Sequence, residues 1–296
     1  MEVISGPVPG RDPRYIDAYA PHEVAKRVEL AGVADASRPI LQMFALAIIG
    51  GSMLGLASAA STATFLGGDA SVGTTRVVAG IVFGVGLSLV MVGGGELFTS
   101  NNLIAMAWVA RQVHATKLLA NWVVVLVGNA IGASSVAVLL VIGGAYSANG
   151  RAFGLLAVEV AVGKADRGFE QHVALGILGN ALVCLAVWLC FSARSTTDRI
   201  LACVLPMTAL MVLNVDHVVA NLHYLTAGLL LRLDPAFADA GGATHLGVDN
   251  VLTSLVGVTL GNIVGGSVLV AAVYWFVYLR TFRRSGYPRH SGSPGS

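Results

Sequence analysis

The sequence predicts an all-α polytopic membrane protein in which six transmembrane helices form two inverted three-helix repeats. Three observations predict it: the composition, the lengths of the uncharged segments and an internal repeat. Hydrophobic residues make up 55% of the 296 residues and charged residues only 11%, whereas a typical soluble domain is about 25% charged. The mean hydropathy is +0.76. These values exclude an ordinary soluble domain.

Six segments are long enough to span a bilayer as helices, which takes about 20 apolar residues. Five of them are 39–68, 77–95, 118–150, 171–193 and 250–279. The sixth, 200–231, would be roughly 48 Å long as a straight helix, well beyond a hydrocarbon core of about 30 Å. Because Asp216 and His217 lie in its middle, we expect a break there. Strands of a β-barrel would alternate apolar and polar residues instead.

Each half of the chain carries the same two signatures in the same order: an acid followed five residues later by Asn, and then a Gly-Asn pair. They are Glu96, Asn101 and Gly128-Asn129 in the first half, and Asp216, Asn221 and Gly261-Asn262 in the second. Three spans in 38–150 thus match three in 169–279. An odd number of spans per repeat inverts the second copy. We therefore expect broken second and fifth helices and a site where the two halves meet.

The two ends of the chain predict its orientation. The first 38 residues carry 11 charges and no early apolar core, so we expect no cleavable signal. If both ends are cytoplasmic, 13 of the 18 Lys and Arg residues lie inside, as the positive-inside rule favours. This predicts a protein of the bacterial inner membrane. The net charge of +2 then reflects orientation, and no nucleic acid partner is expected.

The predicted organisation is a cytoplasmic segment over 1–37, a six-span transport domain over 38–284, and a disordered tail over 285–296, which is rich in Gly, Ser and Pro. Within the first segment, 21–32 is either a short helix at the membrane interface or a solvated leader. Small-xxx-small glycine pairs, such as Gly128 and Gly132 or Gly261 and Gly265, favour close helix packing.

Ionisable residues in the middle of a membrane are costly and indicate function. A broken helix at that depth is tolerated where it lines a cavity, so Asp216 and His217 are expected to line a transport path. Two structural alternatives remain: His217 as a satisfied packing residue, and Glu96 and Asp216 as caps of the inner half-helices, with Asn101 and Asn221 beside them.

The alternative from another class is an intramembrane hydrolase. The sequence contains neither H-E-x-x-H nor G-x-S-x-G, the motifs of metal-dependent and serine hydrolases. Its cysteines, Cys184, Cys190 and Cys203, all lie in apolar runs and are expected to be small buried side chains. We therefore expect no metal and no cofactor.

Five segments together resemble the formate/nitrite transporter family over about residues 14–284. They are 80–87 (GIVFGVGL), 96–101 (ELFTSN), 176–192 (GILGNALVCLAVWLCFS), 217–222 (HVVANL) and 261–265 (GNIVG). The resemblance implies an aquaporin-like protomer in a homopentamer, each protomer having a pore for small monovalent anions. Formate is the first expectation, and nitrite and hydrosulfide are the alternatives within the family.

The resemblance also implies roles for individual residues. At the centre, His217 is the pore histidine with Asn262 as its hydrogen-bond partner, and Thr99 is the threonine of the loop that breaks the second span. The implied lining of the pathway comprises Phe83 at the outer constriction, Leu87 and Leu97 at the inner slit, Phe98 beside Thr99, Lys164 and Asn180 in the outer pathway, and Val183 in the wall. Leu210 departs from the family, in which a second phenylalanine is common there.

These roles give a mechanism as an expectation. Lys164 draws the anion into the outer vestibule, Thr99 and His217 hydrogen-bond it, and His217 either donates a proton or supplies an N–H, since histidine titrates near neutral pH. Asn262 and Asp216 are expected to orient the ring. A water or glycerol channel would carry Asn-Pro-Ala pairs, which are missing from the sequence. An ammonium channel would pair two histidines, whereas the repeat offers Thr99 opposite His217.

Overall fold

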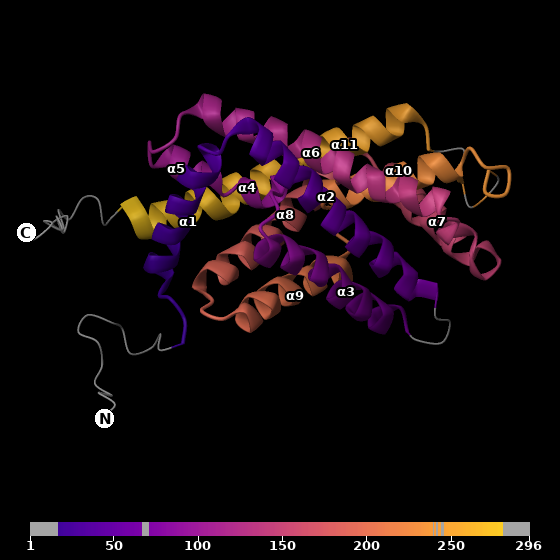
Figure 1. Cartoon of the computed structure of the whole chain (residues 1–296), viewed down its shortest axis with the longest axis horizontal. Helices are drawn as coiled ribbons and strands as arrows, with labels where there is room; N and C mark the ends of the chain where they lie inside the picture. Colours follow the sequence, from indigo (N-terminus) through magenta and orange to yellow (C-terminus); the bar gives the residue numbers. More distant parts are fainter. Residues whose placement is uncertain (1–16, 67–70, 239, 241, 244–245, 281–296) are drawn as a thin grey trace, which may run out of the picture.

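The structure is a computed structural model that describes residues 17–66, 71–238, 240, 242–243 and 246–280. Every regular element in these ranges is a helix, and six of the helices are long and apolar enough to cross a membrane. The predicted all-α, six-span class is therefore confirmed. Figure 1 shows α1 at one end of the bundle and α7 at the other. The predicted tail, 285–296, lies outside the described residues.

The first repeat begins with α2 (Ile40–Ala63), which ends in the short 3-10 helix η1 (Thr64–Leu66). Its second span is broken into α3 (Val72–Gly93) and two short helices, α4 (Phe98–Asn101) and α5 (Ile104–Val109). Its third span is α6 (Ala115–Ile142). The break therefore falls at the predicted acid, Glu96, in the non-helical residues 94–97.

The second repeat has the same plan. It consists of α8 (Phe169–Ser192), a broken span made of α9 (Thr196–Leu213) and α10 (Val218–Leu231), and α11 (Val248–Ile263). The last helix continues as the π-helical segments η5 (Val264–Ala272) and η6 (Trp275–Leu279). We call residues 94–97 the first break and residues 214–217 the second break.

Both breaks begin with a residue in the left-handed conformation. Gly94 has φ 83° after α3, and Asn214 has φ 52° after α9. Glycine and asparagine are the two residues that most readily end a helix in this way. The sequence therefore stops both half-helices locally, before any tertiary contact is considered.

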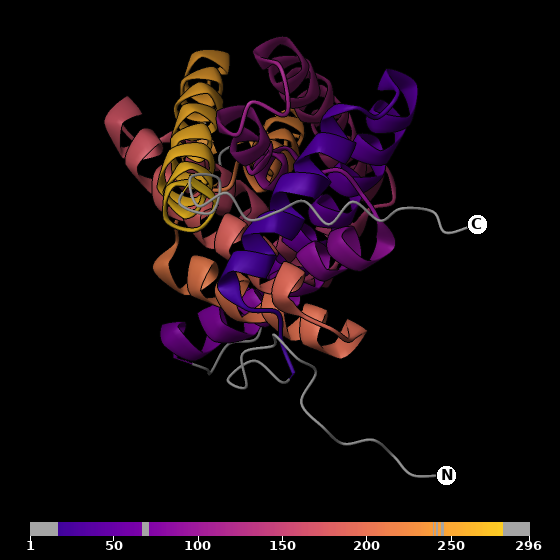
Figure 2. The same cartoon turned by 90° about the vertical axis from the view of Figure 1, so that its left-hand side faces the viewer.

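One further helix precedes the spans of each repeat. The first is α1 (Pro21–Ala36), which extends beyond the interfacial helix considered for 21–32, and the second is α7 (Ala152–Ala165), which lies between the third and fourth predicted spans. They occupy matching places, because α1 packs on α5 after the first break and α7 packs on α10 after the second. The end-on view shows α1 across the near end of the bundle (Figure 2).

Close packing joins the spans within each repeat. Helix α2 lies along α6, and α8 lies along α11. A Cβ atom added at Gly132 would lie 2.1 Å from the Ile48 carbonyl oxygen, and one at Gly265 would lie 2.2 Å from that of Ile177. No side chain fits at such distances, so these glycines set the approach of the two backbones. The small-residue packing predicted from the sequence is confirmed at both sites.

Candidate functional site

The first break is held by one buried asparagine, Asn129 of α6. Its Nδ2 donates to the carbonyl oxygens of Ala47 (2.7 Å) and Glu96 (2.9 Å), and its Oδ1 accepts from the N–H of Phe98 (2.8 Å). Backbone groups freed from a helix at membrane depth must be satisfied by protein or water. Asn129 satisfies two of those groups, one on each side of Leu97.

The second break is held in the same way by Asn262 of α11. Its Nδ2 donates to the carbonyl oxygens of Gly176 (2.8 Å) and Asp216 (3.2 Å), and its Oδ1 accepts from the N–H of Val218 (3.0 Å). The Gly-Asn pairs of the repeat are thus the two anchors of the breaks. Asn262 was expected to bind the ring of His217, but its side chain binds backbone groups: two of them lie on either side of His217, in Asp216 and Val218, and the third belongs to Gly176.

This correspondence sets the register of the repeat. Because the anchors bind equivalent backbone groups, Leu97 of the first break is the counterpart of His217. Thr99 is accordingly the counterpart of Val219. The two polar groups at the centre of the molecule therefore come from different positions of the repeat, one from each break.

Thr99 and His217 nevertheless meet. The Thr99 Oγ1 lies 2.9 Å from the His217 Nε2, and both residues are buried. The His217 Nδ1 accepts from the N–H of Ala220 at 3.3 Å, so His217 caps α10 with its own ring. When Nδ1 is an acceptor, the neutral ring carries its proton on Nε2. That proton faces Thr99, and the pair can present a donor to a small anion.

Apolar side chains surround this pair. Phe83 lies edge-on to the His217 ring, with ring centroids 6.3 Å apart. The other expected gate and wall residues belong to the same buried cluster: Leu87, Leu97, Phe98, Val183 and Leu210. Asn180 is also fully buried, but its Nδ2 donates to the Asn262 carbonyl oxygen at 2.6 Å. It therefore braces the anchor of the second break and does not line the cavities described below.

A cavity of about 290 Å³ reaches His217 from the side that carries α7, and we call it the α7 vestibule. Phe83, Leu210 and Asn221 line its deep part beside His217. The Nδ2 of Asn221 is buried and has no hydrogen-bond partner among the described residues. Asn221, expected to serve only the helix break, thus also offers an amide to this vestibule.

Charged side chains line the α7 vestibule. Three are basic, Arg76, Lys164 and Arg167, and one is acidic, Glu159. Lys164, which was expected to draw the anion into the vestibule, forms an ion pair, because its Nζ lies 2.6 Å from the Asp216 Oδ1. The Arg167 Nη1 lies 2.6 Å from the other carboxylate oxygen of Asp216, which is fully buried. With Asp216 included, these five groups leave the vestibule one positive charge.

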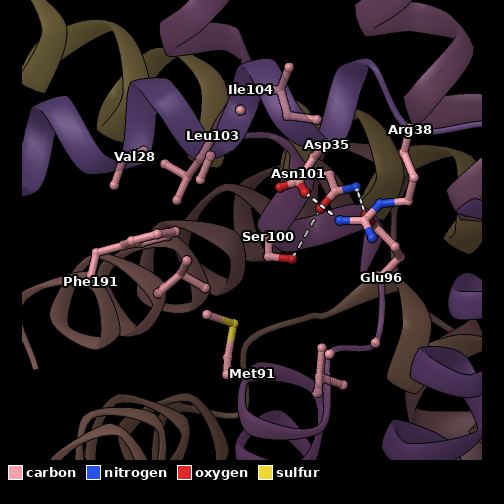
Figure 3. A pocket seen from close by; sticks show the side chains of 16 residues that line it. Val28, Asp35, Arg38, Met91, Glu96, Ser100, Asn101, Leu103, Ile104 and Phe191 are labelled. Atoms are coloured by element: carbon pink, nitrogen blue, oxygen red, sulfur yellow. Dashed lines mark hydrogen bonds and ion pairs between the residues drawn. The ribbon is translucent and has the colours of Figure 1, made fainter. Parts of the chain in front are cut away.

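A second cavity, of about 190 Å³, lies on the side of α1 and is called the α1 vestibule (Figure 3). Its polar wall consists of Asp35, Arg38, Glu96, Ser100 and Asn101. The Arg38 Nη2 lies 2.8 Å from the Asp35 Oδ1, and its Nε lies 2.9 Å from the Glu96 Oε1. The charged groups of this vestibule leave one negative charge. Neither Thr99 nor His217 lines it, whereas His217 lines the α7 vestibule.

The two break acids bind side chains and do not cap helices. The residues at the N-caps of α4 and α10 are Leu97 and His217. Glu96 accepts from the Asn101 Nδ2 at 2.5 Å and pairs with Arg38, whereas Asp216 pairs with two cations. The capping alternative considered for both acids is therefore wrong.

Sequence reasoning missed the arginines that hold these acids. Arg38 and Arg167 each lie two residues before the first span of a repeat, and each pairs with the acid of its own break. A signal was present, because both arginines follow a charged residue by three positions, Asp35 and Lys164. The repeat thus begins earlier than the first span.

Comparisons with known proteins agree with this architecture. The family profile described as "Formate/nitrite transporter" matches residues 22–276. The chain is 38% identical over 274 residues to the formate channel FocA of Escherichia coli (strain K12), covering 89% of this chain and 96% of FocA. It is 30% identical over 263 residues to the formate channel BtFdhC of Bacillus thuringiensis, covering 88% of this chain and 96% of the relative.

Solved structures agree as well. A structure described as a pentameric formate channel with formate bound has a TM-score of 0.73 and 33% identity, covering 81% of this chain and 98% of that chain. A channel of the same family has a TM-score of 0.74 at 23% identity, covering 86% and 98% respectively, which is a likeness of fold.

Proposed function

Since this chain belongs to the formate/nitrite transporter family, and is a membrane transporter and not an enzyme, we propose that it carries formate across the membrane through a pore in each protomer of a homopentamer. The observation that carries this proposal is the contact between Thr99 and His217, 2.9 Å apart at the end of the α7 vestibule. The formate ligand and the pentamer are taken from the similar structure and the similar channels.

The energetics allow passage with a proton. An anion entering an apolar section costs about 3 kcal/mol on insertion scales and more than about 10 kcal/mol in simulations of isolated helices. Protonating a carboxylate with a pKa of about 4 at pH 7 costs roughly 4 kcal/mol. Because the two costs are comparable, formate passes the gates as the neutral acid or as a hydrogen-bonded anion. His217 serves either route, since its Nε2 points toward the bound anion.

Each part of the proposed pathway has its own role. The positive α7 vestibule concentrates the anion, with Lys164 as its deepest cation. Phe83 and Leu210 form the outer constriction, and Leu87 and Leu97 form the inner slit, with Phe98 and Val183 beside them. The α1 side faces the cytoplasm of a bacterial cell, which places both termini inside, and 38–284 is the transporting part.

The test is uptake of radiolabelled formate into proteoliposomes by the His217→Phe variant. We expect uptake to fall at least about tenfold, because losing a hydrogen bond to a charged partner costs about 1.5–3 kcal/mol. The control is His114→Gln, a change at an exposed histidine, which should match the wild type. Unchanged pH-dependent uptake by His217→Phe would contradict the proposed role.

The choice of anion has its own test. Stopped-flow flux of formate, nitrite, hydrosulfide, ammonium and glycerol is measured on one proteoliposome preparation. We expect formate to be fastest and ammonium and glycerol to be excluded, because the site offers a donor between apolar gates. Faster flux of nitrite or hydrosulfide would mean that this anion, and not formate, is the preferred substrate of the same pathway.

A further inference from the structure

The two vestibules are built on equivalent ion pairs. Arg38 holds Glu96 at 2.9 Å, and Arg167 holds Asp216 at 2.6 Å. Both arginines precede the first span of their repeat by two residues. Both acids directly precede the last residue of their break, which is Leu97 or His217. A neutral pair of this kind therefore contributes no net charge to either vestibule.

One position breaks this equivalence. Three residues before the arginine, the first repeat has Asp35 and the second has Lys164. Both side chains line their vestibule and contact the ion pair, because Asp35 lies 2.8 Å from Arg38 and Lys164 lies 2.6 Å from Asp216. The same position of the repeat thus makes one vestibule negative and leaves the other positive. Asp35 is 30% exposed, and its charge faces the cavity (Figure 3).

We propose that Asp35 is the residue that sets the sidedness of anion entry: its carboxylate repels the anion at the α1 vestibule, so the protein saturates at a higher anion concentration from the α1 side than from the α7 side. This inference rests on the proposed anion pathway through both vestibules. Charged clefts change the local concentration of an ionic ligand and its entry rate.

The quantity that reports this effect is the ratio of two half-saturating concentrations, measured from the α1 side and from the α7 side. For a pore with one central site, this ratio equals the entry rate from the α7 side divided by the entry rate from the α1 side. The ratio of maximal rate to half-saturating concentration is the same from both sides, because a passive pore cannot favour a direction at equilibrium. A fixed charge at one mouth therefore changes the half-saturating concentration measured from that side, and it does not change the distribution of the anion at equilibrium.

The experiment measures initial formate uptake in inside-out and right-side-out membrane vesicles, for the wild type and Asp35→Asn. We expect a wild-type ratio above 1, and a ratio about twofold lower for Asp35→Asn at low ionic strength, the effect of one unit charge at roughly 8 Å in a water-like medium. At 0.3 M salt the Debye length is below about 8 Å, and the difference between the two proteins should shrink.

Two variants control for structural effects. Asp35→Glu keeps the charge and should keep the wild-type ratio. Asp198→Asn removes an exposed carboxylate on the same side of the membrane, outside the vestibule, and should leave the ratio unchanged. A ratio unaffected by Asp35→Asn, or lowered equally at both salt concentrations, would overturn the inference. Failure of wild-type vesicles to take up formate would instead contradict the proposed function.

Discussion

The two breaks share one scaffold and differ in their chemistry. In each, a buried asparagine makes three equivalent hydrogen bonds, a left-handed residue ends the first half-helix, and an arginine holds the break acid. The side chain that follows the acid is Leu97 in one break and His217 in the other. The comparison teaches that backbone geometry is fixed by the repeated residues, whereas the pore's function is assigned by the few positions at which the repeats differ.

The scaffold itself gives the largest predicted effect. Asn129→Leu and Asn262→Leu each remove three hydrogen bonds and leave buried backbone groups unpaired, at about 1–3 kcal/mol per group. We expect both variants to lose roughly 10 °C in thermal midpoint in detergent and to give little monodisperse protein. If the two asparagines are equivalent anchors, the two variants should lose similar amounts of thermal midpoint. A stable Asn129→Leu variant beside an unfolded Asn262→Leu variant, or the reverse, would contradict the equivalence.

The central pair tests the difference between the breaks. Thr99→Val removes the hydroxyl that contacts His217, and we expect formate uptake to fall about tenfold, the effect of about 1.4 kcal/mol. Thr99→Ser keeps the hydroxyl and should retain most of the uptake. Equal uptake by the valine and serine variants would mean that the hydroxyl plays no part.

The ion pairs give an effect on stability. Arg38→Gln leaves Glu96 with Asn101, while Arg167→Gln leaves Asp216 with Lys164. Because a buried charge without a counter-charge is strongly destabilising, we expect Arg38→Gln to lower the thermal midpoint more than Arg167→Gln does. The reverse order, measured in the same detergent, would show that Lys164 does not compensate for Arg167.

The smallest effect concerns pH on the α1 side. Burial raises the pKa of the Asp35 carboxyl, opposed by the neighbouring Arg38, so Asp35 takes up a proton at a higher pH than an ordinary aspartate. We expect the ratio of half-saturating concentrations to fall by up to about twofold as the α1-side pH is lowered, beginning at a higher pH than that at which an ordinary aspartate takes up a proton. Glu96 and Arg38 face the same cavity and are still present in Asp35→Asn. The ratio of half-saturating concentrations should therefore depend less on the α1-side pH in Asp35→Asn than in the wild type.

Much of the fold follows from the sequence. The six spans and both breaks could be predicted, because an overlong apolar segment and a repeated acid are local signals. The helix α7 could not, since 14 residues are too few to span a bilayer and the segment lies where a loop is expected. The family resemblance implies that Thr99 and His217 both hydrogen-bond the anion, and their direct contact is a finding of the structure.

The partners of the polar residues were harder to predict. Asn262 was assigned to the ring of His217, yet it binds backbone groups whose positions depend on the packing of α11 against α8. Arg38 and Arg167 were interpreted as charges that orient the protein in the membrane. Their pairing with acids 58 and 49 positions later along the chain arises only when the start of each repeat packs against the break in its second span.

The contact between Thr99 and His217 spans 118 residues of the chain. During synthesis, the first three spans are made before the fifth, and of the central pair they carry only Thr99. A chain made only as far as its third span therefore lacks the donor pair. The proposed anion site is complete only once the fifth span is in place.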